Sequence, residues 1–290
     1  MYLFYWGYFL FWSIVAKGNV IEERHRPRPP PFAWALVYCV LALLLLPLLM
    51  MIFTSLTYKN SDGTFEFTLR YWGEVLQDTQ LGKYVFNSFF VAIFASSLSV
   101  LIGSCAALAL VKTNFIGERF LKISSLASLV FPEIVFALSL LALFFCFNFQ
   151  LSLWTVIMAH ISFSLPYVML TVGARAATLD SSLDDSARDL GASDWQLMYK
   201  IHFPLLKPAI VCGFFLSFLL SFDDFLITFF VNGVGSDTLP IKLYTSMKSG
   251  ITPQLNALTT IIFLVTTALL VVLFQSRFFA KSLEIITKKT

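Results

Sequence analysis

Six long apolar runs constrain the fold of this chain more than any other feature. Each carries few or no charged side chains and is long enough to cross the hydrocarbon core of a bilayer as a helix, which takes about 20 residues. Because backbone N–H and C=O groups find no water at that depth, helix is the predicted conformation of every run. The runs are Phe32–Leu56, Tyr84–Val111, Ile123–Phe147, Leu151–Val172, Pro208–Val231 and Asn256–Ser276.

Composition supports the same class. Hydrophobic residues make up 58% of the 290 residues and charged residues only 13%, whereas a soluble domain averages about 25% charged residues. The sequence therefore predicts an all-α, polytopic membrane protein with six core helices. The second run is rich in Ala, Ser and Gly, which let helices approach closely, and we expect it to pack within the bundle.

The basic residues predict the orientation of the chain. The segments before the first run, between the second and third, between the fourth and fifth, and after the sixth hold fifteen of the 20 Lys and Arg residues. The positive-inside rule places these segments in the cytoplasm. On the opposite side are Lys59, Arg70, Lys83, Lys242 and Lys248.

The first 16 residues, MYLFYWGYFLFWSIVA, are apolar and rich in aromatic side chains. They lack the basic start and the small-residue cleavage site of a signal peptide. We predict an extra hydrophobic helix that spans the membrane or lies on it, with a start codon placed too far upstream as the alternative. We divide the chain into an N-terminal segment with a basic Pro-rich linker at 1–31, the first core span and an extracytoplasmic segment at 32–83, the transmembrane domain at 84–276, and a basic cytoplasmic tail at 277–290.

The longest charged polar run lies between the fourth and fifth apolar runs. Residues 179–204 read LDSSLDDSARDLGASDWQLMYKIHFP. Ser182 and Asp185 have the spacing of a capping box, which predicts the start of a helix. Gly191 can take the left-handed conformation that ends a helix.

A second helix is predicted after this glycine. Ser193 and Gln196 repeat the capping-box spacing, and Pro204 is expected to end the helix. A helix–glycine–helix segment on the cytoplasmic side is well shaped for docking onto another protein. The alternative is an ordinary amphipathic loop lying on the membrane surface.

The spacing in this loop resembles a family pattern. The run from Asp185 to Pro204 is similar to E-A-A-x3-G-x9-I-x-L-P, the EAA loop of the permease subunits of ATP-binding-cassette importers, with Asp for Glu, Ser for the first Ala and Phe203 for Leu. The resemblance implies a type I importer transmembrane domain whose coupling loop sits in a groove of the ATPase subunit. The residues that it assigns to the coupling loop are Asp185, Ser186, Ala187, Gly191, Ala192, Ser193, Ile201 and Pro204.

Three acidic residues lie within the apolar runs, namely Glu133, Asp223 and Asp224. An ionisable group at membrane depth is costly and usually faces a cavity or a partner, so we predict that these acids line a substrate pathway. Pro132 is expected to kink the third run beside Glu133. The alternative is structural: the acids cap broken helices or bond to neighbouring Ser and His side chains, as Ser221 and the mid-run His160 would allow.

No catalytic constellation and no phosphate-binding P-loop occurs in the sequence, so we predict no enzyme activity, no catalytic residue and no cofactor. ATP hydrolysis would then belong to a separate subunit. The four cysteines, Cys39, Cys105, Cys146 and Cys212, lie in apolar stretches without metal-like spacing. We predict buried thiols, with neither a disulfide framework nor a metal site.

Further runs make the resemblance more specific. VFPEIVFALSL, AHISFSLPYV and LSFDDFLITFFVNGVGSDTLPIKLYTSMKSGITPQLNAL are similar to the permeases of spermidine/putrescine importers. The resemblance implies a polyamine cargo, a location in the inner membrane in contact with lipid, and no nucleic-acid partner. It also implies three protein partners: an ATP-binding-cassette ATPase dimer, a second homologous permease and an extracytoplasmic polyamine-binding protein.

Two alternatives stay open from the sequence. The cargo could be another organic cation or a metal complex. In a different class, the chain would be a membrane-embedded signalling or scaffold protein that uses the same loop to bind a partner without moving any cargo.

Overall fold

The computed structural model describes residues 31–59, 65–248, 250 and 252–275. The predicted N-terminal helix at 1–16 and the basic tail at 277–290 lie outside the described residues. The chain divides into two compact units, one made of residues 1–67 with 259–290 and the other of residues 68–258.

In the first unit, α2 (Pro31–Ser55) leads into a short antiparallel pair of strands, β1 (Thr57–Lys59) and β2 (Phe65–Phe67). Tyr58 pairs with Glu66 in this ladder. The helix α13 (Pro253–Gln275) begins in the second unit and continues into the first.

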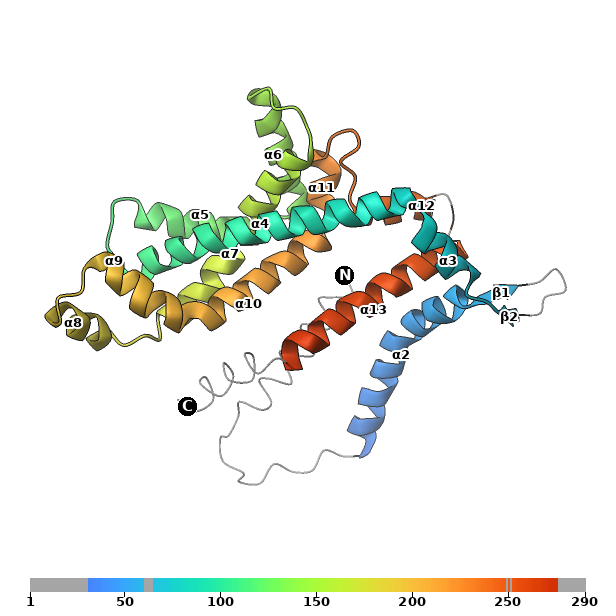
Figure 1. Ribbon diagram of the computed structural model, residues 1–290, viewed down its shortest axis with the longest axis horizontal. Coiled ribbons are helices and arrows are strands. Elements are labelled where there is room, and N and C mark those ends of the chain that lie inside the picture. Colours follow the sequence, from blue (N-terminus) through green and yellow to red (C-terminus); the bar gives the residue numbers. More distant parts are fainter. Residues whose placement is uncertain (1–30, 60–64, 249, 251, 276–290) are drawn as a thin grey trace. The chain divides into compact units, whose positions relative to one another are not determined.

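The second unit contains all the other described elements. They are α3 (Arg70–Gln77), α4 (Thr79–Lys112), α5 (Glu118–Val130), α6 (Glu133–Cys146), α7 (Leu153–Ala176), α8 (Ser182–Asp189), α9 (Asp194–Leu197), the π-helical turn η1 (Met198–His202), α10 (Phe203–Phe222), α11 (Leu226–Val231) and α12 (Leu239–Lys248). Its centre is formed by α4, α7 and α10, which pack against one another, while α11 packs against α6 (Figure 1).

Small residues let α4 approach α7, as the composition of the second run predicts. A β-carbon on Gly103 would lie 2.8 Å from Cγ1 of Val168. Two apolar clusters form along these helices. One joins Val91, Val156, Ile227 and their neighbours, and the other joins Ala107, Val172, Leu206 and theirs.

Helical structure is confirmed for all six predicted runs over their described residues, but two runs are each divided into two helices. In the third, α5 ends at Val130 and α6 begins at Glu133. The predicted kink at Pro132 is therefore a complete break, because proline has no N–H and also forces the preceding residue out of the helical region. In the fifth, α10 ends at Phe222 and α11 begins at Leu226.

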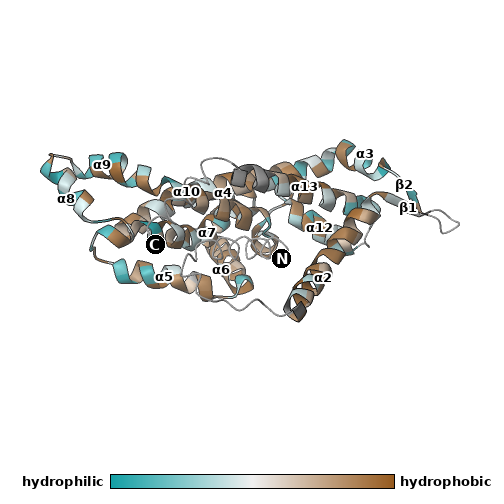
Figure 2. Cartoon of the chain, turned by 90° about the horizontal axis from the view of Figure 1, so that it is seen from below, coloured by the Kyte–Doolittle hydropathy of each residue, from teal (hydrophilic) through white to brown (hydrophobic). Residues whose placement is uncertain are grey.

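Four helical segments of the described residues are long and apolar enough to cross a membrane: Trp34–Ser55, Thr79–Lys112, Leu153–Ala176 and Asp194–Phe222. Shorter apolar helices cover Glu133–Cys146 and Pro253–Ala268. Figure 2 shows apolar residues along these helices and more polar ones over α8 and α9.

The prediction that the cysteines are buried is wrong for three of them. Cys39, Cys105 and Cys146 are exposed, Cys212 is partly buried, and all four are free thiols. An apolar run crossing a bilayer turns much of its surface toward lipid, so an apolar neighbourhood in sequence does not imply burial within the chain.

Candidate functional site

The loop at 179–204 folds as two short helices around a glycine, as predicted. Helix α8 ends just before Gly191, whose φ of 81° lies in the left-handed region. The N–H of Gly191 donates to the carbonyl of Arg188 over 2.8 Å, and the N–H of Ala192 donates to the carbonyl of Ala187 over 3.0 Å. These bonds satisfy carbonyls at the end of α8 and turn the chain into α9.

The two predicted caps have different outcomes. The capping box of Ser193 and Gln196 is confirmed, since each side chain bonds the backbone N–H of the other residue. The capping box of Ser182 and Asp185 is wrong. Ser182 is already the first residue of α8, and its N–H donates to Oδ1 of Asp180 over 2.9 Å. The side chain of Asp180 therefore accepts a hydrogen bond from the N–H of Ser182, which the predicted capping box paired with the side chain of Asp185.

The prediction that Pro204 ends the second helix is also wrong. The helix runs without interruption from Asp194 to Phe222, through the π turn η1. The N–H of Phe203 donates to the carbonyl of Met198, five residues back. A proline inside an α-helix would collide with the carbonyl four residues before it, and the wider π turn just before Pro204 relieves that crowding.

Large apolar side chains of this loop point away from the rest of the described chain. Leu190, Trp195 and Tyr199 are 89%, 73% and 68% exposed. Among the eight predicted coupling residues, Ala187 is buried, Ala192 and Ile201 are partly buried, and the other five are exposed. The loop therefore presents an apolar surface flanked by acidic residues, with the ion pair Arg188–Asp194 joining α8 to α9 over 2.6 Å.

A cluster at the base of the loop was not predicted from the sequence. Oδ2 of Asp184 accepts from Nζ of Lys112 at 2.9 Å, and Oδ1 lies 2.7 Å from Nε2 of His202. Burial alone would raise the pKa of Asp184, but the hydrogen bonds from His202 and Lys112 outweigh it and hold the pKa of this carboxyl below its usual value. The residues are far apart in sequence, and only their shared position at the predicted cytoplasmic side could have suggested a contact.

Within the apolar helices, the structure buries Asp224 in the break between α10 and α11. Its Oδ2 accepts from the N–H and the hydroxyl of Thr228, both at 2.8 Å, and its Oδ1 accepts from the N–H of Ile227 at 3.3 Å. His160 on α7 completes the cluster, with Nδ1 2.7 Å from Oγ of Ser221 and Nε2 3.1 Å from Oδ2 of Asp224. Asp224 thus caps a broken helix, as the structural alternative describes.

The other two acids lie at the same breaks. Glu133 is the first residue of α6, and its carboxyl group lies near enough to that of Asp224 for the two groups to interact electrostatically. Asp223 follows the last residue of α10 and is exposed. The three predicted pathway acids therefore lie where the third and fifth runs are broken. They differ in exposure: Asp223 is exposed, Glu133 is partly buried and Asp224 is buried.

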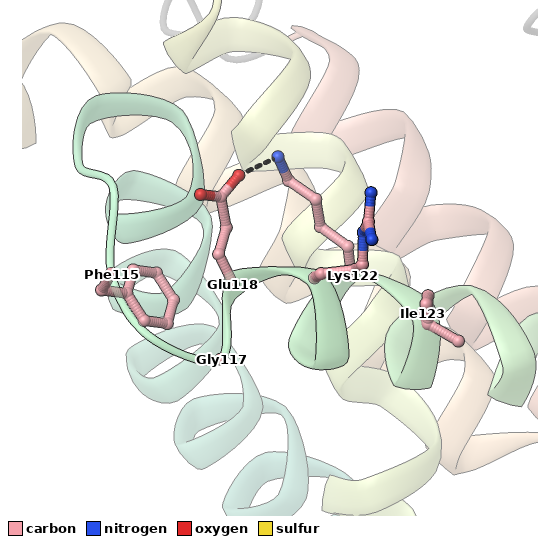
Figure 3. A pocket seen from close by; sticks show the side chains of 6 residues that line it. Phe115, Gly117, Glu118, Lys122 and Ile123 are labelled. Atoms are coloured by element: carbon pink, nitrogen blue, oxygen red, sulfur yellow. Dashed lines mark hydrogen bonds and ion pairs between the residues drawn. The ribbon is translucent and has the colours of Figure 1, made fainter.

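The described residues hold no group of three His, Cys, Asp or Glu side chains that could bind a metal ion. A shallow surface pocket lies beside the start of α5, lined by Phe115, Gly117, Glu118, Arg119, Lys122 and Ile123. Figure 3 shows the ion pair of Glu118 and Lys122 at this pocket. Lys122 is half exposed and Glu118 is partly buried, so the pair offers no fully buried polar group to a ligand.

Comparisons with known proteins give the family. Residues 99–284 match the family described as "Binding-protein-dependent transport system inner membrane component". Residues 1–117 match the family described as "Copper resistance protein D-like, N-terminal domain"; this match covers less than half of the chain.

Similar proteins agree with the match over residues 99–284. The spermidine/putrescine transport system permease protein PotC of Haemophilus influenzae is 34% identical over 238 residues, covering 82% of this chain and 93% of that protein. The putrescine transport system permease protein PotI of Escherichia coli K12 is 32% identical over 239 residues, covering 79% and 85%.

A solved structure shares the fold. The bacterial ABC transporter involved in the import of the acidic polysaccharide alginate contains a chain that superposes with a TM-score of 0.68 at 17% identity, covering 87% of this chain and 100% of that chain. The chain has the fold of a type I importer transmembrane domain, and it belongs to the family of binding-protein-dependent transport system inner membrane components, as a multi-pass permease of the PotC type.

Proposed function

We propose that this chain is the permease subunit of an ATP-driven importer that moves polyamines such as spermidine and putrescine across the inner membrane. The names of its relatives support this cargo, because two different polyamine permeases match about four fifths of the chain at more than 30% identity. In this proposal the subunit itself hydrolyses no ATP, because a separate ATPase subunit would do so.

The observation that carries the proposal is the geometry of the loop at 179–204. Two helices turn at Gly191 with three large apolar side chains exposed. Exposed apolar area of this kind is characteristic of a surface that binds another protein. In the proposed orientation this surface faces the cytoplasm and docks in a groove of an ATPase dimer, with Asp185, Ser186 and Ala187 at the start of the contact. The membrane domain at 84–276 would also pair with a second homologous permease and receive cargo from an extracytoplasmic polyamine-binding protein.

A polyamine carries several ammonium groups, and each needs a replacement for its lost hydration. Among Glu133, Asp223 and Asp224, the exposed Asp223 is best situated to meet a passing cation. The carboxylate of Asp224 accepts hydrogen bonds from Thr228 at the start of α11, and these bonds fix the segment that carries Asp223. We infer that Asp223, with Glu133 nearby in the fold, supplies the carboxylates of the pathway. Two described helices that could cross the membrane contain no Lys or Arg between Tyr84 and Val111 or between Leu153 and Val172, which favours a cationic over an anionic cargo.

Uptake by the reconstituted complex tests the function. The chain is co-expressed with a second permease and an ATPase from the same organism, placed in proteoliposomes and supplied with a polyamine-binding protein and labelled spermidine. We expect uptake that needs both ATP and the binding protein. A complex whose ATPase carries a replaced P-loop lysine is the control and should take up nothing. Assembly of the complete complex without uptake of spermidine or putrescine would refute the polyamine assignment.

A further inference from the structure

The strongest unassigned feature of the chain is the cluster of Lys112, Asp184 and His202, which we call the Asp184 clamp. Each oxygen of the Asp184 carboxylate has its own partner, and each partner comes from a different helix. Lys112 is the last residue of α4, and His202 is the last residue of η1, where α10 begins. One side chain of the loop therefore holds two membrane helices at once.

The clamp is partly shielded from water. The side chains of Lys112 and Asp184 are 17% and 18% exposed, and that of His202 is 6% exposed. Screening by water and salt weakens exposed ion pairs much more than shielded ones. Removing one partner of a shielded pair also leaves a charge without compensation. By contrast, the pair Glu118–Lys122 on α5 lies within one helix, and its side chains are 26% and 50% exposed.

Helix α8 has little else to attach it to the helices of the membrane domain. It is 8 residues long, and Ala187 is its only buried residue in the described structure. Its other side-chain bond to a different helix, Arg188 to Asp194, leads to α9. Displacement of α8 reaches α10 through the turn at Gly191 and the continuous helix that begins with α9, and also through the contact of Asp184 with His202. Its side-chain contact with α4 runs through Asp184 to Lys112.

The receiving helices are central ones. Both α4 and α10 pack against α7 and against each other (Figure 1), and a well-packed core transmits strain because it leaves few voids to absorb it. His202 lies in a π turn, a helical irregularity that is frequent at functional sites.

We propose that Asp184 is the positioning residue through which motion of the coupling loop reaches the membrane helices. This inference rests on the proposed function, since it assumes that a partner moves the loop. The EAA-like pattern begins at Asp185, one residue later, so the clamp adds a transmission contact to the docking contacts. When the ATPase displaces α8, Asp184 carries the ends of α4 and α10 with it.

The test separates assembly from coupling in proteoliposomes that hold the whole complex. Asp184→Asn and Lys112→Met are each compared with wild type for ATP hydrolysis and for spermidine uptake. We expect assembled complexes in which the ATP hydrolysed per spermidine imported rises about fivefold, the low end of typical coupling between sites. Lys112→Arg, which keeps the charge, should stay near wild type. Glu118→Gln, which breaks an ion pair within the single helix α5 on the same predicted side, is the matched control and should change nothing.

A double variant identifies the contact itself. If Lys112 and Asp184 act as one unit, Lys112→Met combined with Asp184→Asn should be no worse than the poorer single variant. The inference would be overturned if the double variant raised the ratio of ATP to spermidine by the product of the two single effects. It would also be overturned if both single variants kept the wild-type ratio. If Asp184→Asn does not assemble, Lys112→Met carries the comparison, because it removes only one arm of the clamp.

Amide hydrogen exchange in the detergent-solubilised chain makes the clamp testable apart from the cargo. Faster exchange in α8 of both Asp184→Asn and Lys112→Met, but not of Glu118→Gln, would support the clamp even if wild-type complex imported no spermidine and the proposed function failed. Unchanged exchange in α8 would overturn the clamp even if spermidine uptake by wild type were robust.

Discussion

The Nε2 atom of His160, on α7, lies 3.1 Å from the Oδ2 atom of Asp224, in the break between α10 and α11. Both side chains are only 2% exposed. Because a carboxylate only accepts hydrogen bonds, Nε2 must carry the hydrogen in this contact. The pair joins two helices across the interior of the membrane domain and fixes the point at which the fifth run stops being helical.

The first prediction concerns this pair. His160→Ala should lower the free energy of unfolding by about 1–3 kcal/mol, because it leaves buried acceptors and hydroxyls without a partner. Asp224→Asn should be destabilising as well, since it weakens the cap on the N–H groups of Ile227 and Thr228. The midpoint of thermal unfolding of the solubilised chain measures both effects. A midpoint equal to wild type in both variants would show that the break does not depend on this pair.

The second prediction separates the two neighbouring acids. Asp223→Asn should reduce polyamine uptake while leaving thermal stability and complex assembly near wild type, because the exposed Asp223 meets the cation in the proposed pathway. Asp224→Asn should instead lower the midpoint of thermal unfolding. Glu133→Gln is measured alongside at matched expression. Wild-type uptake in all three variants would defeat the cation pathway and favour purely structural acids.

The third prediction compares two glycines of α4. A β-carbon on Gly103 would lie 2.8 Å from Cγ1 and 3.0 Å from Cβ of Val168, a stiff side chain. Gly103→Ala should therefore cost about 1–3 kcal/mol through overpacking. Gly82 has no atom within 4 Å of such a carbon, so Gly82→Ala should be neutral or gain up to about 1 kcal/mol of helix propensity. Equal melting midpoints for the two variants would contradict the close packing of α4 on α7.

The fourth prediction concerns the turn between α8 and α9. Gly191→Val places a branched side chain at a φ of 81°, where it is strained by roughly 1–2 kcal/mol. We expect the chain to insert into the membrane but to bind the ATPase less tightly, as measured by co-purification. Gly117, with a φ of 101° in the loop between α4 and α5, is the matched control. If Gly117→Val weakened ATPase binding as much as Gly191→Val, the effect would come from backbone strain in general.

The fifth prediction tests the orientation of the chain. A single cysteine at Ser182, exposed at the start of α8, should react with a membrane-impermeant maleimide only from the cytoplasmic side. One at Val234, exposed in the segment between α11 and α12, should react only from outside. The background must lack the exposed native thiols Cys39, Cys105 and Cys146. Labelling of both sites from one face would exclude the proposed topology.

Apolar length was enough to locate the helices, because a chain without water around its backbone has few conformations to choose from. It was not enough to show that the third and fifth runs are broken. The break at Pro132 had a local signal in the proline, and its extent exceeded the predicted kink. The break at Asp223 had no local signal beyond two adjacent acids. His160 lies 64 positions from Asp224 in the sequence and contacts it only once the helices have packed.

The loop at 179–204 was predictable where the rule is local and not where it depends on distant residues. The left-handed Gly191 and the cap formed by Ser193 follow from neighbouring residues. The contact of Asp184 with Lys112 spans 72 positions, and no spacing rule in the sequence reaches that far.

The π turn at Met198–His202 has a consequence for the direction in which the loop faces. A π turn accommodates one residue more than an α-helix would need for the same stretch. Deleting one residue from this turn would restore a regular α-helix and rotate α9 by about 100° around the axis of α10. Trp195 and Tyr199 would then point to another side of the helix, although no side chain had been altered. The number of residues in this turn therefore sets the direction, around the axis of α10, in which the exposed side chains of the loop point.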